Sequence, residues 1–325
     1  MKAVVQQRYG TIEFGVADTP VAGDNEVLVQ VRAAAVNAYD WHIMRGDPYI
    51  VRLMAPSVFG FRGPKRNIRG RDFAGVVEAV GRNVTRFQPG DEVYGDLGPA
   101  DGAFAEYAAV PENQLEPKPT RLSFEQAAAV PLAGSTALQG LRDLRAGQRI
   151  LINGASGGVG TFAVQLAKHL GADVTAVCST RNVEMVYDLG ANHVIDYTRH
   201  DFAHDERTYD LVFDLVGNRS LKDLRRVLTT TGTVVLSGGG VSHGGSVLGP
   251  LRLILRTQLM SRFVRHNLTV LSATPTNATL AELGQIIDSG AVTPVVDRTY
   301  PLSETADAIH YVEIDHARAK VVITV

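Results

Sequence analysis

Short apolar runs separated by glycine and proline fill the N-terminal third of the chain. The clearest runs cover residues 27–31, 75–80, 91–94 and 104–110 and are rich in valine and aromatic residues. Short runs of this kind, bounded by turn formers, are typical of strands that turn back on themselves. The pattern therefore predicts a compact, mostly antiparallel β domain.

The pattern changes at Phe124, where helical periodicity begins to alternate with short apolar runs at 150–152, 173–177, 211–215 and 233–236. Strands that alternate with helices predict a parallel sheet. After Asn267, short strands at 268–272 and 321–325 flank a helix at 280–289, and we expect this segment to fold back onto the first domain. The predicted domains are residues 1–123 with 266–325, and residues 124–265.

A glycine-rich turn lies within a strand–turn–helix pattern, R-I-L-I-N-G-A-S-G-G-V-G-T-F-A-V-Q-L-A-K-H-L, at residues 149–170. A strand follows within about 30 residues, which is the size of a βαβ unit. This context favours a dinucleotide-binding loop, although Ala155 stands at the first glycine position of the usual motif. The alternative is a glycine turn that binds no ligand.

The residues of the turn have predicted roles in binding a pyrophosphate or in packing the helix that follows. Gly157 lets the backbone approach the anion, Gly160 lets the helix pack on the strand, and Ser156 adds a hydroxyl donor. Gly158 and Val159 lie at the start of the helix, where N–H groups are free to bind an anion.

The cofactor preference is indicated by the residues that follow the next strand, Ser179, Thr180 and Arg181. NAD sites place a carboxylate about 20 residues beyond the glycine loop, on the ribose 2′-hydroxyl. Here two hydroxyls and a guanidinium could instead bind a 2′-phosphate, which predicts NADPH. The alternative is that Arg181 is a solvated residue at a helix start and that the site accepts either nucleotide.

Composition limits the classes of partner. The chain has 325 residues, a mass of 35.0 kDa and a formal net charge of −2, so it carries no basic excess for nucleic acid or an anionic membrane. Cys178 is its only cysteine, which excludes an intrachain disulfide and a zinc site of several thiolates. The sequence shows neither a signal peptide nor a membrane span, so we expect a cytoplasmic protein with small-molecule partners.

Six segments carry a resemblance to a known family: residues 35–40, 70–77, 89–93, 102–107, 131–137 and 154–160. With these, the chain resembles the medium-chain dehydrogenase/reductase superfamily, and within it the zinc-free quinone oxidoreductase branch that includes zeta-crystallin. The tail at 294–320 resembles the same branch, with Ala319 in place of the usual glycine. The resemblance implies an α/β fold made of a GroES-like β domain and a Rossmann domain with a doubly wound parallel sheet, a cleft between them, and a homodimer.

The resemblance also implies cofactor contacts outside the glycine loop. Thr136 is expected near the nicotinamide, and Tyr197 and Lys320 near the 2′-phosphate. Three further residues are expected along the cofactor: Gly217, Ser237 and Gly238.

Zinc is expected to be absent. Zinc-dependent relatives have a cysteine in the segment matching residues 37–40, and a histidine followed by glutamate where this chain has Arg71 and Asp72. Without a Lewis acid, oxidation of a plain alcohol is disfavoured. A quinone or an α,β-unsaturated carbonyl is already electrophilic, so holding it close to the nicotinamide would supply most of the catalysis.

Hydrogen-bond donors for the reduced substrate are expected in the segment that the resemblance assigns to the cleft. The candidates are Asn37, Tyr39, Asp40, His42 and Tyr49. For Asp40 the alternative is a cap on the following helix. For His42 it is a surface or core histidine with no catalytic part.

Two further segments leave their roles open. Six basic residues between 52 and 71 could attract an anionic substrate such as an acyl-CoA, or could be a solvated face. Residues 248–264 are apolar all round a helical wheel, which favours burial in a core or a dimer contact over a membrane-surface helix. The alternative is that this segment forms the wall of a pocket for a hydrophobic quinone tail. The leading hypothesis is an NADPH-dependent reductase of quinones or enones. The alternatives are an enoyl-thioester reductase and a non-catalytic NADPH-binding protein of the crystallin kind.

Overall fold

The computed structural model describes residues 1–47, 49, 52–53, 60, 63–237, 257, 264–315 and 317–325. The chain forms two compact units. Unit 1 comprises Met1–Ser135, Thr274–Gly290 and Pro294–Val325, and unit 2 comprises Thr136–Ala273 and Ala291–Thr293. No helix among these residues is long and apolar enough to cross a membrane.

Unit 1 is built on a seven-stranded sheet in the order β14-β15-β3-β4-β5-β7, with β6 also paired to β3. Its strands are β3 (Glu26–Val36), β4 (Asp72–Val80), β5 (Glu92–Asp96), β6 (Tyr107–Pro111), β7 (Leu115–Pro117), β14 (Val296–Pro301) and β15 (Lys320–Thr324). All neighbours are antiparallel except β14 and β15. The antiparallel β domain predicted from the sequence is therefore confirmed.

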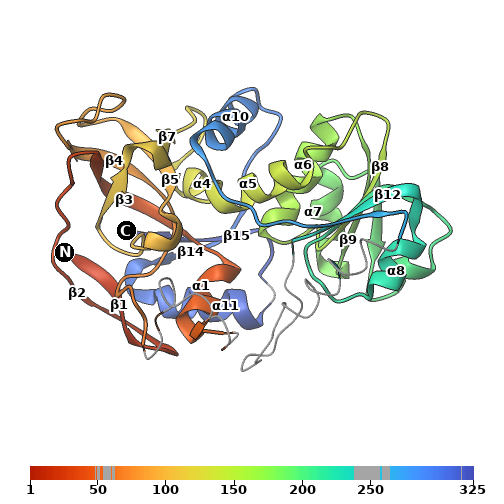
Figure 1. Cartoon of the computed structure of the whole chain (residues 1–325), viewed down its shortest axis with the longest axis horizontal. Coiled ribbons are helices and arrows are strands. Elements are labelled where there is room, and N and C mark those ends of the chain that lie inside the picture. Colours follow the sequence, from red (N-terminus) through yellow and green to blue (C-terminus); the bar gives the residue numbers. More distant parts are fainter. Residues whose placement is uncertain are drawn as a thin grey trace. The chain divides into compact units, whose positions relative to one another are not determined.

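The C-terminal strand β15 lies within this sheet, between β14 and β3. Val321 to Thr324 pair with Val36 to Ala33 of β3, so the last strand of the chain is the neighbour of a strand from its first 36 residues (Figure 1). A separate hairpin of β1 (Lys2–Arg8) and β2 (Thr11–Val16) completes the strands described in unit 1.

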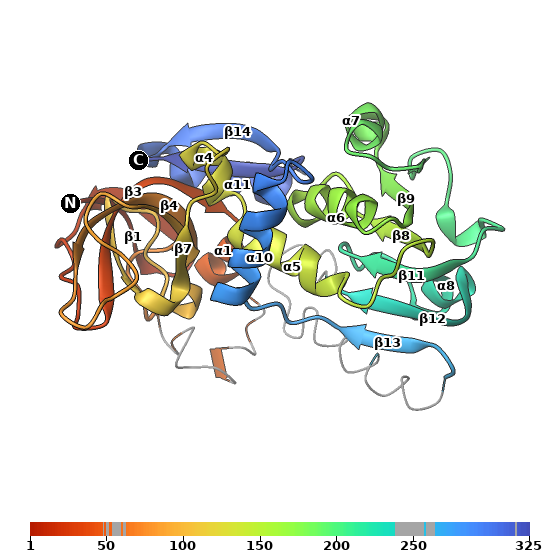
Figure 2. The same ribbon diagram turned by 90° about the horizontal axis from the view of Figure 1, so that it is seen from above.

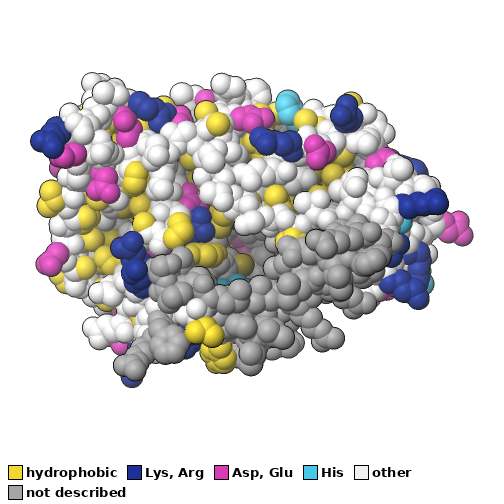
Figure 3. Space-filling view, in the orientation of Figure 1, with side chains coloured by type: hydrophobic (Ala, Val, Ile, Leu, Met, Phe, Trp, Pro, Cys, Tyr) yellow, Lys and Arg dark blue, Asp and Glu magenta, His cyan; other side chains and the backbone are white. Residues whose placement is uncertain are grey.

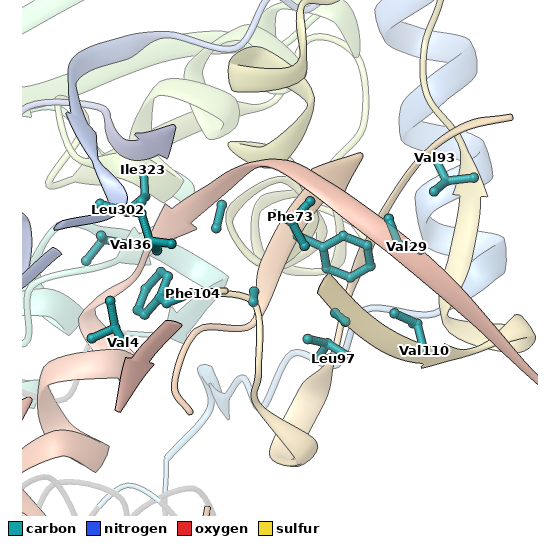
Figure 4. Close-up of a cluster of buried hydrophobic side chains, with 14 of the residues drawn as sticks. Val4, Val29, Val36, Phe73, Val93, Leu97, Phe104, Val110, Leu302 and Ile323 are labelled. Atoms are coloured by element: carbon teal, nitrogen blue, oxygen red, sulfur yellow. The ribbon is translucent and has the colours of Figure 1, made fainter. Parts of the chain in front are cut away.

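The core of unit 1 joins side chains from distant parts of the sequence. Val4, Val36 and Phe104 lie in one cluster with Leu302 and Ile323 (Figure 4). The helices of this unit are α1 (Ala38–Arg45), α4 (Phe124–Ala128), α10 (Asn277–Asp288) and α11 (Thr305–Ile314), with 3-10 turns at Gly98–Ala100, Glu112–Gln114 and Leu302–Glu304. The tail of the chain is thus part of the unit 1 core.

Unit 2 contains a six-stranded parallel sheet in the order β10-β9-β8-β11-β12-β13. Its strands are β8 (Arg149–Asn153), β9 (Asp173–Cys178), β10 (His193–Asp196), β11 (Tyr209–Asp214), β12 (Leu228–Leu236) and β13 (Asn267–Val270). The helices with described bounds in this unit are α6 (Gly158–His169), α7 (Val183–Asp188) and α8 (Leu221–Arg226), with 3-10 turns at Thr180–Asn182 and Phe202–His204. Helix α5 (Pro131–Gly140) runs from unit 1 into unit 2. The strand order reverses between β8 and β11, which is where ligands of such sheets bind.

The border between the units differs from the predicted one. Residues from 266 onward were expected in the first domain, but β13 pairs in parallel with β12 and is the outer strand of the unit 2 sheet (Figure 2). The chain returns to unit 1 at Thr274. A four-residue strand does not reveal from its own sequence which sheet supplies its partner.

Basic and acidic side chains are interspersed on the face of the molecule in Figure 3. This distribution agrees with the small net charge of −2. Segment 248–264, apart from Thr257 and Val264, lies outside the described residues, so its predicted role is not tested.

Candidate functional site

The glycine turn follows β8 directly and leads into helix α6. Gly154 has a φ of 90°, a conformation that glycine adopts readily, and Gly157 is the N-cap residue of the helix. A Cβ on Gly160 would lie 2.2 Å from the carbonyl oxygen of Gly154, so only glycine allows this close approach of helix and turn. A Cβ on Gly157 would meet that oxygen at 3.5 Å, an ordinary contact. The close packing predicted for Gly160 is therefore present, whereas the approach of a pyrophosphate to Gly157 stays a prediction.

The helix start has features that suit an anion, and the predicted phosphate site there stays a prediction. Ser156, Gly157, Gly158 and Val159 are half-buried in this turn, and α6 carries no acidic residue in its first turn. The unpaired N–H groups and the positive end of the helix dipole favour a phosphate there.

The residues after β9 lie beside the end of β10. Cys178 and Asp196 are paired in register, so Ser179, Thr180 and Arg181 lie near Tyr197, whose exposure is 54%. The Thr180 hydroxyl, a predicted phosphate ligand, donates a hydrogen bond to Asp196 at 2.6 Å. The 2′-phosphate candidates of unit 2 are thus brought together at one end of the sheet.

Asp196 is a residue that the sequence reasoning missed. Its carboxylate accepts hydrogen bonds from the Thr180 hydroxyl and from the hydroxyl and backbone amide of Thr198. The Arg199 guanidinium lies 3.6 Å from the same carboxylate, and these contacts hold the pKa of Asp196 below its usual range. A carboxylate therefore does stand near the expected 2′-phosphate position. The sequence could have indicated Asp196, because it ends a strand, β10, that lies parallel to β9, and polar residues follow both strands at the same edge of the sheet.

Asn182 was missed as well. Its side-chain amide donates to Ser156 of the glycine turn at 3.0 Å and to Ser179 at 3.2 Å. One side chain thus joins the two loops that the sequence assigns to the phosphates of the nucleotide.

A buried polar group occupies the point where the strand order reverses. Asp214, at the end of β11, accepts hydrogen bonds from the Asn153 side chain at 2.8 Å and from the Gly217 amide at 3.0 Å. The Ser237 amide donates to its carbonyl oxygen at 2.9 Å. Gly217 and Ser237, both expected along the cofactor, are therefore held by one residue, whereas Gly238 lies outside the described residues. Thr136 is buried on α5, with 6% exposure.

In unit 1, four polar side chains form a buried cluster, which we call the Lys320 cluster: Asn37, Asp40, Asp72 and Lys320. The Lys320 ammonium donates to Asn37 Oδ1 at 2.5 Å, and the Asn37 amide donates to Asp72 at 3.0 Å. Asp72 also accepts from the Leu132 amide at the start of α5. Lys320, expected near the 2′-phosphate, is only 3% exposed and has these partners inside unit 1, which supports a part in positioning Asn37.

Charge is costly inside this cluster. Burial raises the pKa of Asp40 to about 8. Burial also raises the pKa of Asp72, which the Lys320 ammonium opposes at 3.7 Å, and burial lowers the pKa of Lys320. Asp40 accepts a hydrogen bond from the Asn37 backbone amide at 2.7 Å and completes a capping box on α1, so the capping role that the sequence offers as the alternative for Asp40 is present in the structure.

The remaining donor candidates lie on or just after α1. The guanidinium of Arg71 lies 4.6 Å from the Tyr39 ring and pairs with Asp96, and burial raises the pKa of Tyr39 to about 12. His42 stacks on Trp41 at 3.6 Å, and burial lowers its pKa. Tyr49 is 49% exposed. Tyr39, Asp40 and His42 thus share one helix, whereas Tyr49 lies beyond it.

Half of the basic residues of segment 52–71 make contacts within unit 1. Arg52 stacks on Tyr9 at 3.9 Å, Arg69 pairs with Asp101 at 2.8 Å and is 1% exposed, and Arg71 pairs with Asp96. These guanidinium groups support the structure of unit 1 instead of forming an anionic-substrate face.

Zinc ligands are not grouped anywhere in the described ranges. There, no three His, Cys, Asp or Glu side chains come together in a way that could hold a metal ion. The guanidinium of Arg71 fills the position where zinc-dependent relatives have a histidine. The zinc-free state remains a prediction from the residues at these positions.

Comparisons with known proteins agree with this architecture. The family models that match are the alcohol dehydrogenase GroES-like domain, over residues 23–120, and zinc-binding dehydrogenase, over residues 189–323. The NADPH-dependent alkenal/one oxidoreductase of Arabidopsis thaliana is 35% identical, over 99% of this chain and 79% of the relative. The 2-methylene-furan-3-one reductase of Solanum lycopersicum gives the same identity and coverage.

A solved structure of an oxidoreductase is similar to this chain over its whole length. The quinone oxidoreductase from Coxiella burnetii has a TM-score of 0.87 and 29% identity, over 100% of this chain and 99% of that one. A GroES-like unit joined to a parallel sheet with this glycine turn defines a class of NAD(P)H-dependent oxidoreductases. The chain belongs to the medium-chain dehydrogenase/reductase superfamily, in its quinone oxidoreductase and alkenal/one oxidoreductase branch.

Proposed function

We propose that the chain reduces quinones or α,β-unsaturated aldehydes and ketones with NADPH, without a metal ion. The observation that carries the proposal is the glycine turn at the start of α6, where Gly160 leaves room for the backbone to fold against Gly154. The names of the relatives from Arabidopsis and tomato, which act on alkenals, alkenones and a methylene furanone, support the substrate class.

NADPH is the preferred nucleotide in this proposal. Arg181 and Ser179 lie after β9, where an adenosine 2′-phosphate would be recognised, and a guanidinium suits that dianion. The Arabidopsis relative is named as NADPH-dependent. Replacing Arg181 with Gln should raise the dissociation constant for NADPH roughly tenfold and leave that for NADH within about twofold. If the dissociation constants for NADPH and NADH change by the same factor, Arg181 does not recognise the 2′-phosphate.

The chemistry requires little of the protein beyond placement and one donor. Bound NADPH supplies a hydride. Addition of the hydride to the β-carbon of an enone moves the electron pair to the carbonyl oxygen, and a proton then completes the reduced product. The protein must stabilise the oxyanion while it forms, which hydrogen-bond donors aimed at that oxygen can do.

Tyr39 is the donor that unit 1 supports best. Its phenol carries its proton across the physiological range, burial raises its pKa further to about 12, and the Arg71 guanidinium lies 4.6 Å from its ring. His42 has a lowered pKa, so above pH 6.5 most of its imidazole is neutral and poorly suited to deliver a proton.

Two matched variants separate these candidates. Tyr39→Phe should lower kcat for a quinone roughly tenfold while NADPH affinity is unchanged, whereas His42→Ala should change kcat by less than about threefold. Tyr107→Phe on β6 serves as the control. If His42→Ala is the variant that loses activity, the donor is His42.

A substrate panel tests the function itself. Purified protein is given NADPH with a quinone, an enal, an enone, an enoyl-CoA or a plain ketone, and nucleotide oxidation is followed by absorbance. We expect turnover of the first three, and metal chelation should leave it unchanged. Turnover of the enoyl-CoA alone would favour the thioester reductase, and tight NADPH binding without any turnover would favour a binding protein.

We further propose a cytoplasmic homodimer. Among the described residues β13 is an outer strand of the unit 2 sheet and its side chains alternate between exposed and half-buried, which supports an assembly because an edge strand can pair with another chain. Light scattering should give twice the 35.0 kDa chain mass. A monomer at working concentration would end this part of the proposal.

A further inference from the structure

One side chain joins two loops at the carboxyl edge of the unit 2 sheet. The Asn182 amide nitrogen lies 3.0 Å from Ser156 Oγ in the glycine turn and 3.2 Å from Ser179 Oγ after β9. The two serines are 23 positions apart in the sequence and belong to different βα turns. Both βα turns open onto the edge of the sheet where nucleotides bind.

Helix capping does not account for this asparagine. Asn182 occupies the N-cap position of α7, where an asparagine would ordinarily accept a hydrogen bond from the first helical turn. Its side chain makes no such bond and turns toward the two serines. The side chain is therefore used between the loops and not on its own helix.

Stability alone does not account for it either. Asn182 is 3% exposed, and its Oδ1 is buried without a hydrogen-bond partner among the described residues. A buried carbonyl oxygen without a partner is unfavourable, and an apolar side chain of similar size would avoid that cost. A polar group kept at such a cost is expected where function requires it.

The direction of the hydrogen bonds shows what the amide does. A serine oxygen that accepts a bond from Asn182 keeps its own hydrogen for another acceptor. Accepting a bond also strengthens the O–H as a donor. Ser156 and Ser179 are both half-buried, so each hydroxyl can present its hydrogen to a phosphate oxygen at the loop surface.

We propose that Asn182 is a positioning residue for the nucleotide, which orients the Ser156 and Ser179 hydroxyls together as phosphate donors. The inference rests on the proposed function, because it takes the phosphorylated nucleotide as the ligand of both loops. It adds that the loops bind the two ends of the adenosine moiety as a coupled pair. Asn182 itself need not touch the ligand.

A double-mutant cycle measures this coupling. NADPH dissociation constants are determined by fluorescence titration for Ser156→Ala, Ser179→Ala and Asn182→Leu, singly and combined. We expect Asn182→Leu to raise the dissociation constant about tenfold and each serine variant to raise it severalfold. In the Asn182→Leu background, each serine variant should add less than about twofold, because the hydroxyls are no longer oriented.

Two further measurements separate positioning from a structural role. The melting temperature of Asn182→Leu should stay close to that of the wild type, because the variant loses two hydrogen bonds to half-buried serines but also removes a buried oxygen that has no partner among the described residues. The control is Asn192→Leu, which breaks a 3.0 Å bond to the Val174 amide near the start of β9 and should leave NADPH affinity unchanged.

The outcomes are distinct. Wild-type affinity in Asn182→Leu, or serine effects that remain fully additive in its background, would overturn the inference while the proposed function stands. A wild-type protein that binds no NADPH in the same titration would overturn both.

Discussion

The Lys320 ammonium lies 2.5 Å from Asn37 Oδ1, which joins the last strand of unit 1 to the segment that precedes α1. Lys320 also lies 3.7 Å from Asp72, and neither side chain is more than 3% exposed. Removing one partner of a buried ion pair leaves an uncompensated charge, which is more costly than the pair itself. The stability of unit 1 should therefore depend on this lysine.

Lys320→Met should lower the free energy of unfolding by about 3 kcal/mol, measured by urea denaturation. The double variant Lys320→Met with Asp72→Asn should recover part of the loss, since the buried carboxylate is gone. Lys222→Met, on the exposed face of α8, should change stability by less than about 0.5 kcal/mol. Equal stability of Lys320→Met and wild type would refute the role assigned to the pair.

The glycine turn gives a contrast between two substitutions three residues apart. Gly160→Ala would bring a Cβ to 2.2 Å from a backbone oxygen, so it should disrupt the turn and lower the yield of folded protein. Gly157→Ala meets only an ordinary 3.5 Å contact, so the protein should fold with a loss of about 1 kcal/mol and bind NADPH at least tenfold more weakly. Circular dichroism and nucleotide titration distinguish the two. Normal folding of Gly160→Ala would show that the turn can relax.

Asp40 gives a prediction about pH. Its pKa is raised from 3.8 to about 8 by burial, so between these values the folded state binds a proton that the unfolded state has released. Stability should therefore fall as pH rises from about 4 to 8, with a slope of at most about 1.4 kcal/mol per pH unit from this group. Asp40→Asn, which resembles the protonated acid, should flatten that slope.

Urea denaturation at several pH values measures the slope, with Asp143→Asn at an exposed position as the control. An Asp40→Asn protein that keeps the wild-type slope would show that Asp40 is not the group responsible.

Asp196 should reduce the preference for NADPH. Its carboxylate stays charged and lies at the strand end beside Thr180, where a 2′-phosphate would be repelled. Asp196→Asn keeps the shape and an acceptor for Thr180, so the affinity for NADPH should rise about threefold while that for NADH changes little. Parallel titrations with both nucleotides measure the ratio of the affinity for NADPH to the affinity for NADH. If this ratio is lower in the variant than in the wild type, Asp196 supports the phosphate site through Thr180.

Local patterns predicted most of the fold. The glycine turn and its βαβ unit follow from about 30 consecutive residues, and β8, α6 and β9 lie where expected. Partners distant in the sequence could not be predicted in this way. The membership of β13 in the unit 2 sheet depends on β12, and nothing in a four-residue strand specifies it.

The candidate site shows the same division. Ser156 and Ser179 were found because each follows a strand, but Asn182 and Asp196 depend on contacts between loops. The Lys320 cluster brings together residues 283 positions apart in the sequence, so local spacing carries no sign of it. Side-chain hydrogen bonds across such separations appear only when the backbone has brought the strands into register.

The insertion of β15 next to β3 has a consequence for synthesis on the ribosome. The six strands that the structure describes in unit 2 lie between residues 149 and 270, so that sheet can assemble while the tail is still being translated. Until Lys320–Thr324 emerges, the stretch of β3 from Ala33 to Val36 lacks its neighbour and exposes backbone groups that a second nascent chain could pair with. The interval before the final strand arrives is thus the period of greatest exposure to misassembly, and chaperone binding would be most useful then.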